Sequence, residues 1–129
     1  MELSADRLDK HPEDASNSIS TYGVCNMQGF RPRQEDTHIV VEVDQPDHKK
    51  GVLACVFDGH GGEEVSVWVE ERFTKYFLDT AQFKAQDYSG ALKETFRLLD
   101  DEVKGVEEAR IAEKCKTDEK DPKNLRERE

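Results

Sequence analysis

The chain has 129 residues, which is the length of one ordinary domain. Charged residues make up 37% of the sequence and hydrophobic residues 35%, so part of the chain is expected to lie outside a hydrophobic core. The formal net charge of -10 disfavours nucleic acid and anionic membrane surfaces as partners, because both would be repelled. An acidic chain suits the binding of cations instead.

The cysteines predict a reducing compartment. Cys25, Cys55 and Cys115 cannot all pair with one another, and none has the C-x-x-C spacing of zinc or redox sites. The first residues, from Met1 to Arg7, lack the basic and then apolar pattern of a signal peptide, and no apolar run approaches the length of a membrane span. We therefore expect a cytoplasmic protein, with the nucleus as the alternative, that is neither secreted nor inserted into a membrane.

The chain begins with a polar segment, residues 1–18, which has no hydrophobic period and contains Pro12. We expect this segment to be a mobile lead-in without chemistry. Residues 20–27 mix β-branched and polar residues as a strand does, and a Gln-Gly turn follows. Residues 37–43, Thr-His-Ile-Val-Val-Glu-Val, are dense in β-branched residues and predict a second strand.

Residues 52–57, Val-Leu-Ala-Cys-Val-Phe, form a continuous apolar run that is typical of a strand buried on both faces. After this strand the period changes, and one face of a predicted helix collects Val65, Trp68, Val69, Phe73, Tyr76 and Phe77. Ser89 is the expected N-cap of a second helix, whose apolar face is predicted to contain Leu92, Phe96, Leu99, Val103 and Val106. A loop is expected between the two helices, near residues 81–88.

The last segment, residues 107–129, is rich in charges of both signs and poor in apolar residues. It is either a solvated extension of the second helix, broken by Pro122, or a disordered loop, and the low apolar content favours the loop. The expected organisation is therefore a lead-in at 1–18, a folded part at 19–106 and a charged tail at 107–129.

The sequence Asp58-Gly59-His60-Gly61-Gly62 places an acid and an imidazole directly after the third predicted strand. Its glycines let the backbone approach a ligand closely. The Asp58 carboxylate and the Gly59 carbonyl oxygen can bind a hard cation, and His60 can act as an acid or a base near neutral pH. The alternative is an ordinary turn in which Asp58 caps the helix and His60 is merely exposed.

A second cluster, residues 31–36, has the sequence Arg-Pro-Arg-Gln-Glu-Asp and connects the first two predicted strands. Its guanidinium groups suit phosphate oxygens, and its adjacent carboxylates attract divalent metal. Taken alone, such a segment is more often a solvated turn. Short antiparallel strands would, however, bring this cluster and residues 58–62 together.

The two clusters resemble the first two signature motifs of the type-2C family of metal-dependent protein serine/threonine phosphatases. The motifs are residues 27–38, Met-Gln-Gly-Phe-Arg-Pro-Arg-Gln-Glu-Asp-Thr-His, and residues 56–62, Val-Phe-Asp-Gly-His-Gly-Gly. The resemblance runs from about Tyr22 to Gly105. It implies an α+β fold, an antiparallel β-sandwich flanked by helices in αββα layers, of which this chain holds the N-terminal strands and the first two helices.

The resemblance also implies a cofactor, a reaction and roles for individual residues. Two ions, Mg²⁺ or Mn²⁺, would activate a water that attacks phosphorylated protein substrates without a covalent phosphoenzyme. Asp58 resembles the carboxylate that bridges the two metals, Glu35 a ligand of one metal, and the Gly59 carbonyl a ligand of the other. Asp36 resembles the neighbouring acid that binds or orients metal-bound water.

Two further residues have counterparts in the family. Arg31 resembles the phosphate-binding guanidinium, and His60 resembles the general acid for the leaving seryl or threonyl oxygen. Gln34 stands where the family usually has an apolar residue, often Met, which we expect to change packing rather than chemistry. His38 is expected either to support the site or to pack within its strand.

The family completes its metal shells with further aspartates from its C-terminal two-thirds, because octahedral metals need about six oxygens each. Three functions therefore remain open. The chain is part of an active phosphatase, or it is a phosphatase-like fragment that binds metal or a partner without catalysis. The third is a generic α+β interaction domain whose motifs are accidental.

Overall fold

The computed structural model describes the backbone of residues 9–118 and the side chains of residues 9–110. The elements are β1 (Lys10–Ser16), β2 (Thr21–Met27), β3 (Thr37–Asp44), β4 (Lys50–Phe57), α1 (Glu64–Asp79), α2 (Ala81–Lys84) and α3 (Tyr88–Asp118). Strand β1 pairs with β2 and strand β3 with β4, both antiparallel, in two separate sheets. The chain therefore has the α+β fold that the sequence predicts.

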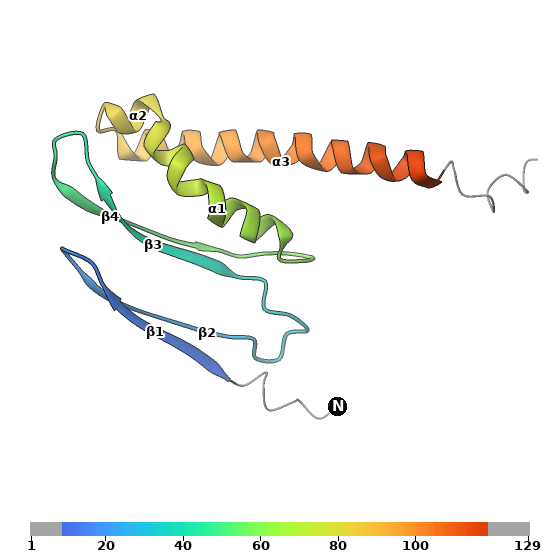
Figure 1. Ribbon diagram of the computed structural model, residues 1–129, viewed down its shortest axis with the longest axis horizontal. Coiled ribbons are helices and arrows are strands. Elements are labelled where there is room, and N and C mark those ends of the chain that lie inside the picture. Colours follow the sequence, from blue (N-terminus) through green and yellow to red (C-terminus); the bar gives the residue numbers. More distant parts are fainter. Residues whose placement is uncertain (1–8, 119–129) are drawn as a thin grey trace, which may run out of the picture.

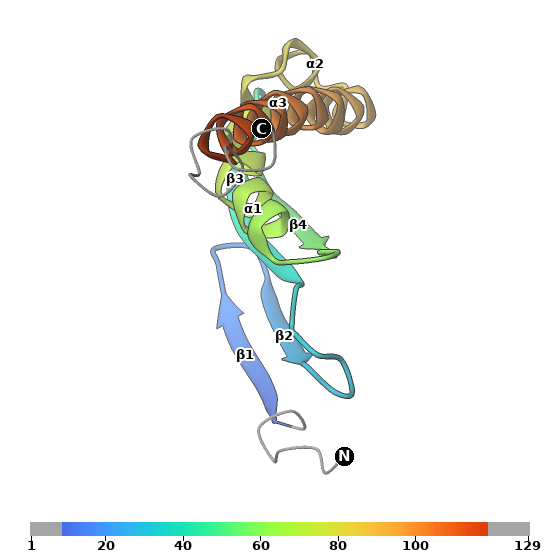
Figure 2. The ribbon, with the colours of Figure 1, turned by 90° about the vertical axis from the view of Figure 1, so that its right-hand side faces the viewer.

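The helices cover one face of the β3–β4 sheet, and the β1–β2 hairpin lies on its other face (Figure 1, Figure 2). The core lies on the helical side. There Leu53 and Phe57 of β4 are buried together with Phe73 and Phe77 of α1. The rings of Phe57 and Phe73 have their centroids 5.3 Å apart, so this aromatic contact joins sheet and helix directly.

Strand β4 is buried on one face, whereas its apolar run predicts burial on both. Leu53 and Phe57 are 7% and 8% exposed, but Val52 and Val56, which point to the other face, are 40% and 75% exposed. Val52 and Val56 line a cavity of about 610 Å³ together with Tyr22 of β2. The second face of β4 is therefore only partly covered within the described residues.

Two polar contacts join the β1–β2 hairpin to the β3–β4 sheet. The backbone N–H of Ser18 donates a hydrogen bond of 2.8 Å to the Glu42 carboxylate, and the Ser18 hydroxyl donates to the same oxygen. These bonds, the hydroxyl first, lower the pKa of the Glu42 carboxyl. The second contact brings His38 Nε2 to 3.7 Å from Glu13 Oε2.

Strand β1 lies within the segment that the sequence predicts to be a mobile lead-in, so that prediction is wrong for Lys10–Ser16. The strand pairs with β2 along its whole length, and Asn17 Oδ1 in the connecting turn accepts a 2.9 Å hydrogen bond from the backbone of Ser20. Pro12 is tolerated because β1 is an edge strand. Strand β1 is formed by backbone pairing rather than by burial of apolar side chains. For this reason its polar composition does not predict a strand. Residues 1–8 lie outside the described part.

The predicted loop between the two long helices contains the short helix α2. Thr80 caps it, since Thr80 Oγ1 accepts a 3.1 Å hydrogen bond from the Phe83 N–H. Helix α3 begins one residue before the predicted cap Ser89. Asp87 takes the capping position instead, because its Oδ1 accepts a 2.9 Å hydrogen bond from the Gly90 N–H.

The face that helix α3 turns to the core agrees only in part with the predicted one, since Leu99 is buried as predicted but two residues outside the predicted set are buried more deeply. Ala91 and Thr95 are fully buried and Leu99 is 3% exposed, whereas Leu92 and Phe96 are 38% and 57% exposed. Helix α3 packs on α1 and α2, and small buried side chains such as Ala91 and Thr95 permit close approach of packed elements. The Thr95 hydroxyl is satisfied there by donating a 2.7 Å hydrogen bond to the Ala91 carbonyl oxygen.

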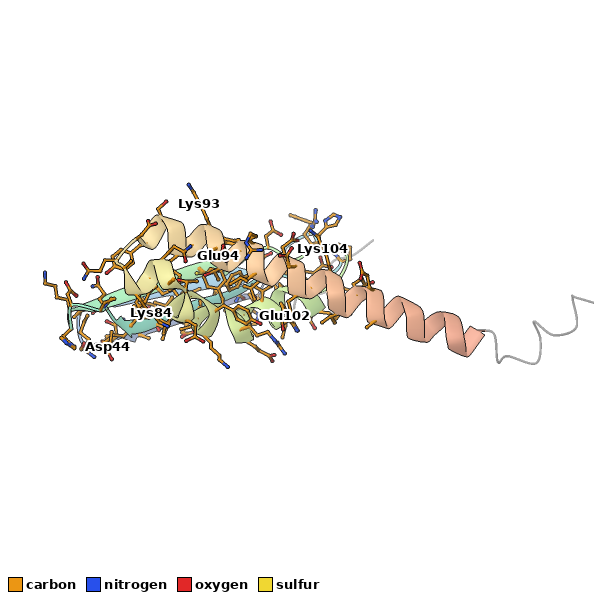
Figure 3. All side chains as sticks on the ribbon, turned by 90° about the horizontal axis from the view of Figure 1, so that it is seen from above. Asp44, Lys84, Lys93, Glu94, Glu102 and Lys104 are labelled. Atoms are coloured by element: carbon orange, nitrogen blue, oxygen red, sulfur yellow. The ribbon has the colours of Figure 1, made fainter. Side chains whose placement is uncertain are left out.

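Helix α3 also continues to Asp118, so residues 107–118 are a helical extension rather than the favoured disordered loop. The part after Lys104 runs on past the sheets (Figure 1, Figure 3). Ion pairs along the helix, such as Lys104–Asp100 at 2.6 Å and Arg110–Glu107 at 3.0 Å, support it. Pro122 lies outside the described residues. No helix in the described part is apolar over enough length to cross a membrane.

Candidate functional site

The candidate site lies at the end of the β3–β4 sheet where β3 begins and β4 ends. Thr37 pairs with Phe57, so the residues before β3 and those after β4 leave the sheet side by side. They line a single cavity of about 720 Å³, formed by Arg31, Pro32, Arg33, Gln34, Glu35, Asp36, Asp58, Gly59, His60 and Gly61. The structure thus brings together the two clusters that the sequence singles out.

The chain turns from β4 to α1 through Gly61 and Gly62, whose φ angles of 72° and 139° favour glycine. Gly59 has a different reason to be glycine. A Cβ atom at this position would lie 2.9 Å from Glu35 Cβ and would collide with the Glu35 carbonyl oxygen. The backbone of Glu35 therefore packs directly against the turn that carries Asp58.

The charged side chains of the cavity are open to solvent. Arg31, Asp36, Asp58 and His60 are exposed, and Glu35 is half-buried. Among the ion pairs of the described residues, none involves the arginines of the 31–36 segment. An unpaired guanidinium next to carboxylates can bind the oxygens of a phosphate that also carries a cation.

The donor atoms of the cavity suit a hard divalent cation. They are the carboxylates of Glu35, Asp36 and Asp58 and the carbonyl oxygen of Gly59, and hard cations bind oxygen. Within residues 9–110, however, no group of three or more acidic, His or Cys side chains is close enough to hold an ion. The residues present fit the chemistry of a divalent cation, and together they offer only part of the oxygens that such an ion needs.

His38 is not among the residues that line the cavity. It lies on the face of β3 that is turned toward the β1–β2 hairpin, where its Nε2 atom is near the Glu13 carboxylate. The pair attracts when the imidazole is protonated. Two roles are expected for His38, support of the site or packing on its strand. The structure favours packing, here against Glu13 of the β1–β2 hairpin.

Two residues that organise the site are not singled out from the sequence. Gln28 Nε2 donates hydrogen bonds of 2.9 Å and 3.0 Å to the carbonyl oxygens of Arg31 and Pro32, which shapes the loop before β3. Ser66 Oγ donates a 2.6 Å hydrogen bond to the Glu35 carbonyl oxygen. Ser66 had a signal, since it is a hydroxyl within the apolar run of α1, but its partner is 31 residues away in the chain.

Comparison with known proteins identifies the family. The family model described as protein phosphatase 2C matches residues 20–120. Probable protein phosphatase 2C 5 of Paramecium tetraurelia is 35% identical over 98 residues, which are 76% of this chain and 32% of the relative. Probable protein phosphatase 2C 60 of Arabidopsis thaliana is 32% identical over 103 residues, which are 80% of this chain and 28% of the relative.

A fission yeast relative gives the same result. Protein phosphatase 2C homolog 3 of Schizosaccharomyces pombe is 32% identical over 107 residues, which are 78% of this chain and 26% of the relative. The chain thus spans about a third or less of the length of these curated relatives. The family match covers most of the chain and includes both clusters of the cavity. The chain belongs to the protein phosphatase 2C family.

Proposed function

We propose that this chain is a catalytic part of a metal-dependent phosphatase that hydrolyses phosphoserine and phosphothreonine in proteins. The observation that carries the proposal is the single cavity into which the strand pairing brings Arg31, the acidic residues and His60. Family membership supports the reaction class. A phosphorylated protein is the proposed substrate, and nucleic acid remains an unfavourable partner because of the net charge of -10.

Arg31 and His60 act on the substrate in this proposal. The exposed guanidinium of Arg31 binds two phosphate oxygens, which orients the phosphoryl group in the cavity. His60 gives a proton to the seryl or threonyl oxygen as the bond between this oxygen and phosphorus breaks. Protonation matters because the leaving alkoxide is a strong base.

The acidic residues of the cavity hold divalent cations in this proposal. Asp58, Glu35, Asp36 and the Gly59 carbonyl oxygen would be the ligands for two ions, Mg²⁺ or Mn²⁺. Bound cations would supply an activated water nucleophile and would neutralise charge on the phosphoryl group. The packing of Glu35 against Gly59 supports this role, since it keeps a carboxylate-bearing residue next to Asp58.

The second candidate is a phosphatase-like module that binds a cation or a partner without catalysis. It is favoured by one observation, namely that no three acidic, His or Cys side chains converge among the described residues. For either candidate we propose a cytoplasmic or nuclear location. The free thiols of Cys25 and Cys55 are compatible with a reducing compartment.

Phosphate release by the full chain from a phosphothreonine peptide, measured with and without Mn²⁺, tests the proposal. We expect release to depend on Mn²⁺, and Asp58→Asn to lower it about 100-fold or more, because the cation would lose a carboxylate ligand. The matched control is Asp79→Asn, an exposed aspartate at the far end of α1, which should leave the rate unchanged.

Calorimetric titration of the same proteins with Mn²⁺ separates the two candidates. Mn²⁺ binding that Asp58→Asn abolishes, without phosphate release by the unmodified chain, would favour the non-catalytic module. Activity that survives Asp58→Asn would show that Asp58 does not hold the catalytic cation.

A further inference from the structure

The hydroxyl of Ser66 connects helix α1 to the acidic loop before β3. Ser66 is 4% exposed, in the first turn of α1. Its Oγ atom lies 2.6 Å from the Glu35 carbonyl oxygen and 3.0 Å from the Glu63 carbonyl oxygen, so these two acceptors share the single hydroxyl proton. In the opposite direction, the Thr37 hydroxyl donates a 3.1 Å hydrogen bond to the Ser66 carbonyl oxygen.

These contacts hold the chain on both sides of Asp36. The residue before Asp36 accepts a hydrogen bond from Ser66, and the residue after it, Thr37, donates one to Ser66. Because a peptide unit is planar, the direction of the Glu35 carbonyl also sets the position of the Asp36 Cα atom. The single residue Ser66 therefore fixes the backbone from which both carboxylates project.

Gly59 confines the same peptide from another side. The Glu35 backbone comes so close to Gly59 that even a methyl group would not fit between them. The Glu35 main chain is thus held by a hydrogen bond from α1 and by van der Waals contact with the turn after β4. This arrangement sets the distance between the acidic pair, Glu35 and Asp36, and the Asp58 carboxylate.

The helix itself does not need the Ser66 hydroxyl. The Glu63 carbonyl oxygen already accepts a 2.9 Å hydrogen bond from the Val67 N–H, as in any first helical turn. The bond from Ser66 to Glu63 is also the longer of its two bonds. The hydroxyl is therefore better accounted for by its bond to the loop than by capping of α1.

We propose that Ser66 is a positioning residue, whose buried hydroxyl holds the Glu35–Asp36 peptide against Gly59 so that the acidic pair is oriented for a divalent cation. This inference rests on the proposed function for the identity of the ligand. The positioning of the loop rests on the hydrogen bonds alone.

Two measurements on the full chain test the inference, with Ser66→Ala as the main variant. In hydrogen–deuterium exchange without metal, we expect the backbone amides of residues 31–37 to exchange about tenfold faster, because the loop loses a bond to α1. In calorimetric titration with Mn²⁺, we expect the affinity to fall about tenfold, as it does when groups that orient metal ligands are removed.

Thr95→Val is the matched control. It also removes a buried hydroxyl that donates to a carbonyl oxygen, but its partner Ala91 lies in α3, away from the cavity. We expect it to lower the unfolding temperature while leaving both the exchange of residues 31–37 and the Mn²⁺ affinity unchanged. If Ser66→Ala does not fold, Thr37→Val gives the same test, because it removes the hydrogen bond from the Thr37 hydroxyl to the Ser66 carbonyl oxygen.

Exchange of residues 31–37 that is no faster in Ser66→Ala than in Thr95→Val would overturn the inference. Unchanged Mn²⁺ affinity in Ser66→Ala would overturn it as well. If the unmodified chain binds no Mn²⁺ and releases no phosphate, the proposed function is refuted, but the positioning role of Ser66 is not. The exchange measurement still decides in that case whether Ser66 positions the loop.

Discussion

At the scale of single residues, Gly59 is the position of the site that leaves least room for change. Its backbone lies against Glu35, and the nearest atoms that an added Cβ would meet are backbone or Cβ atoms, which cannot swing away. Because of this close packing, the backbones of the two clusters are in direct contact at Glu35 and Gly59. It also predicts how the chain should respond to a single methyl group.

We expect Gly59→Ala to lower the free energy of unfolding by about 1–3 kcal/mol, because the methyl group would push the Glu35 backbone away. Urea denaturation followed by circular dichroism measures this change. Gly105→Ala is the control, since a Cβ there meets nothing within 4 Å and lies in helix α3. It should stabilise the chain by up to about 1 kcal/mol. Equal stabilities of the two variants would contradict the close approach of Glu35 and Gly59.

At the scale of elements, helix α3 consists of two segments that differ in stability. Its first turns are buried at Ala91, Thr95 and Leu99, whereas the residues from Lys104 to Arg110 are exposed. The exposed part depends on ion pairs along the helix, which contribute only a few tenths of a kcal/mol each. The two parts should therefore differ strongly in their sensitivity to loss of an apolar side chain.

We expect Leu99→Ala to lower the free energy of unfolding by about 2–5 kcal/mol, because it opens a cavity in the core. Val106→Ala should change it by less than about 0.5 kcal/mol, because Val106 is 52% exposed. Thermal or urea unfolding of both variants gives the comparison. A loss for Val106→Ala as large as that for Leu99→Ala would mean that the C-terminal part of α3 is packed against another surface.

At the scale of the whole molecule, the two sheets face each other without filling the space between them. The cavity between the sheets measures about 610 Å³, and Val56 at its margin is 75% exposed. Open apolar strand surfaces promote association with other chains. The chain by itself should therefore be marginally stable and prone to aggregation.

Replacement of Val56 tests this expectation. Val56→Thr should reduce aggregation, measured by light scattering on heating, and should change the free energy of unfolding by less than about 0.5 kcal/mol, because the side chain is already in water. Val43→Thr is the matched control, since Val43 is 7% exposed and lies in the core. It should destabilise the chain by about 1–3 kcal/mol. A sharp cooperative melt without aggregation of the unmodified chain would contradict the open sandwich.

The residues that line the cavity and most of the elements that place them can be predicted from the sequence alone. Strands β2, β3 and β4 and helix α1 follow from local patterns, and both clusters of the site were singled out from their residue types. This was possible because strand and helix periods and Gly-rich turns are short-range signals. The roles of Arg31, Glu35, Asp36, Asp58 and His60 came from family resemblance and remain a prediction.

The contacts between surfaces that are distant in the sequence are visible only in the folded chain. They include β1, a polar strand formed by backbone pairing, and the burial of Ala91 and Thr95 beside the predicted Leu99 on α3. They also include the hydrogen bond from Ser66 to Glu35 across 31 positions of the chain. Such features depend on partners that are distant in sequence, and no local pattern records them.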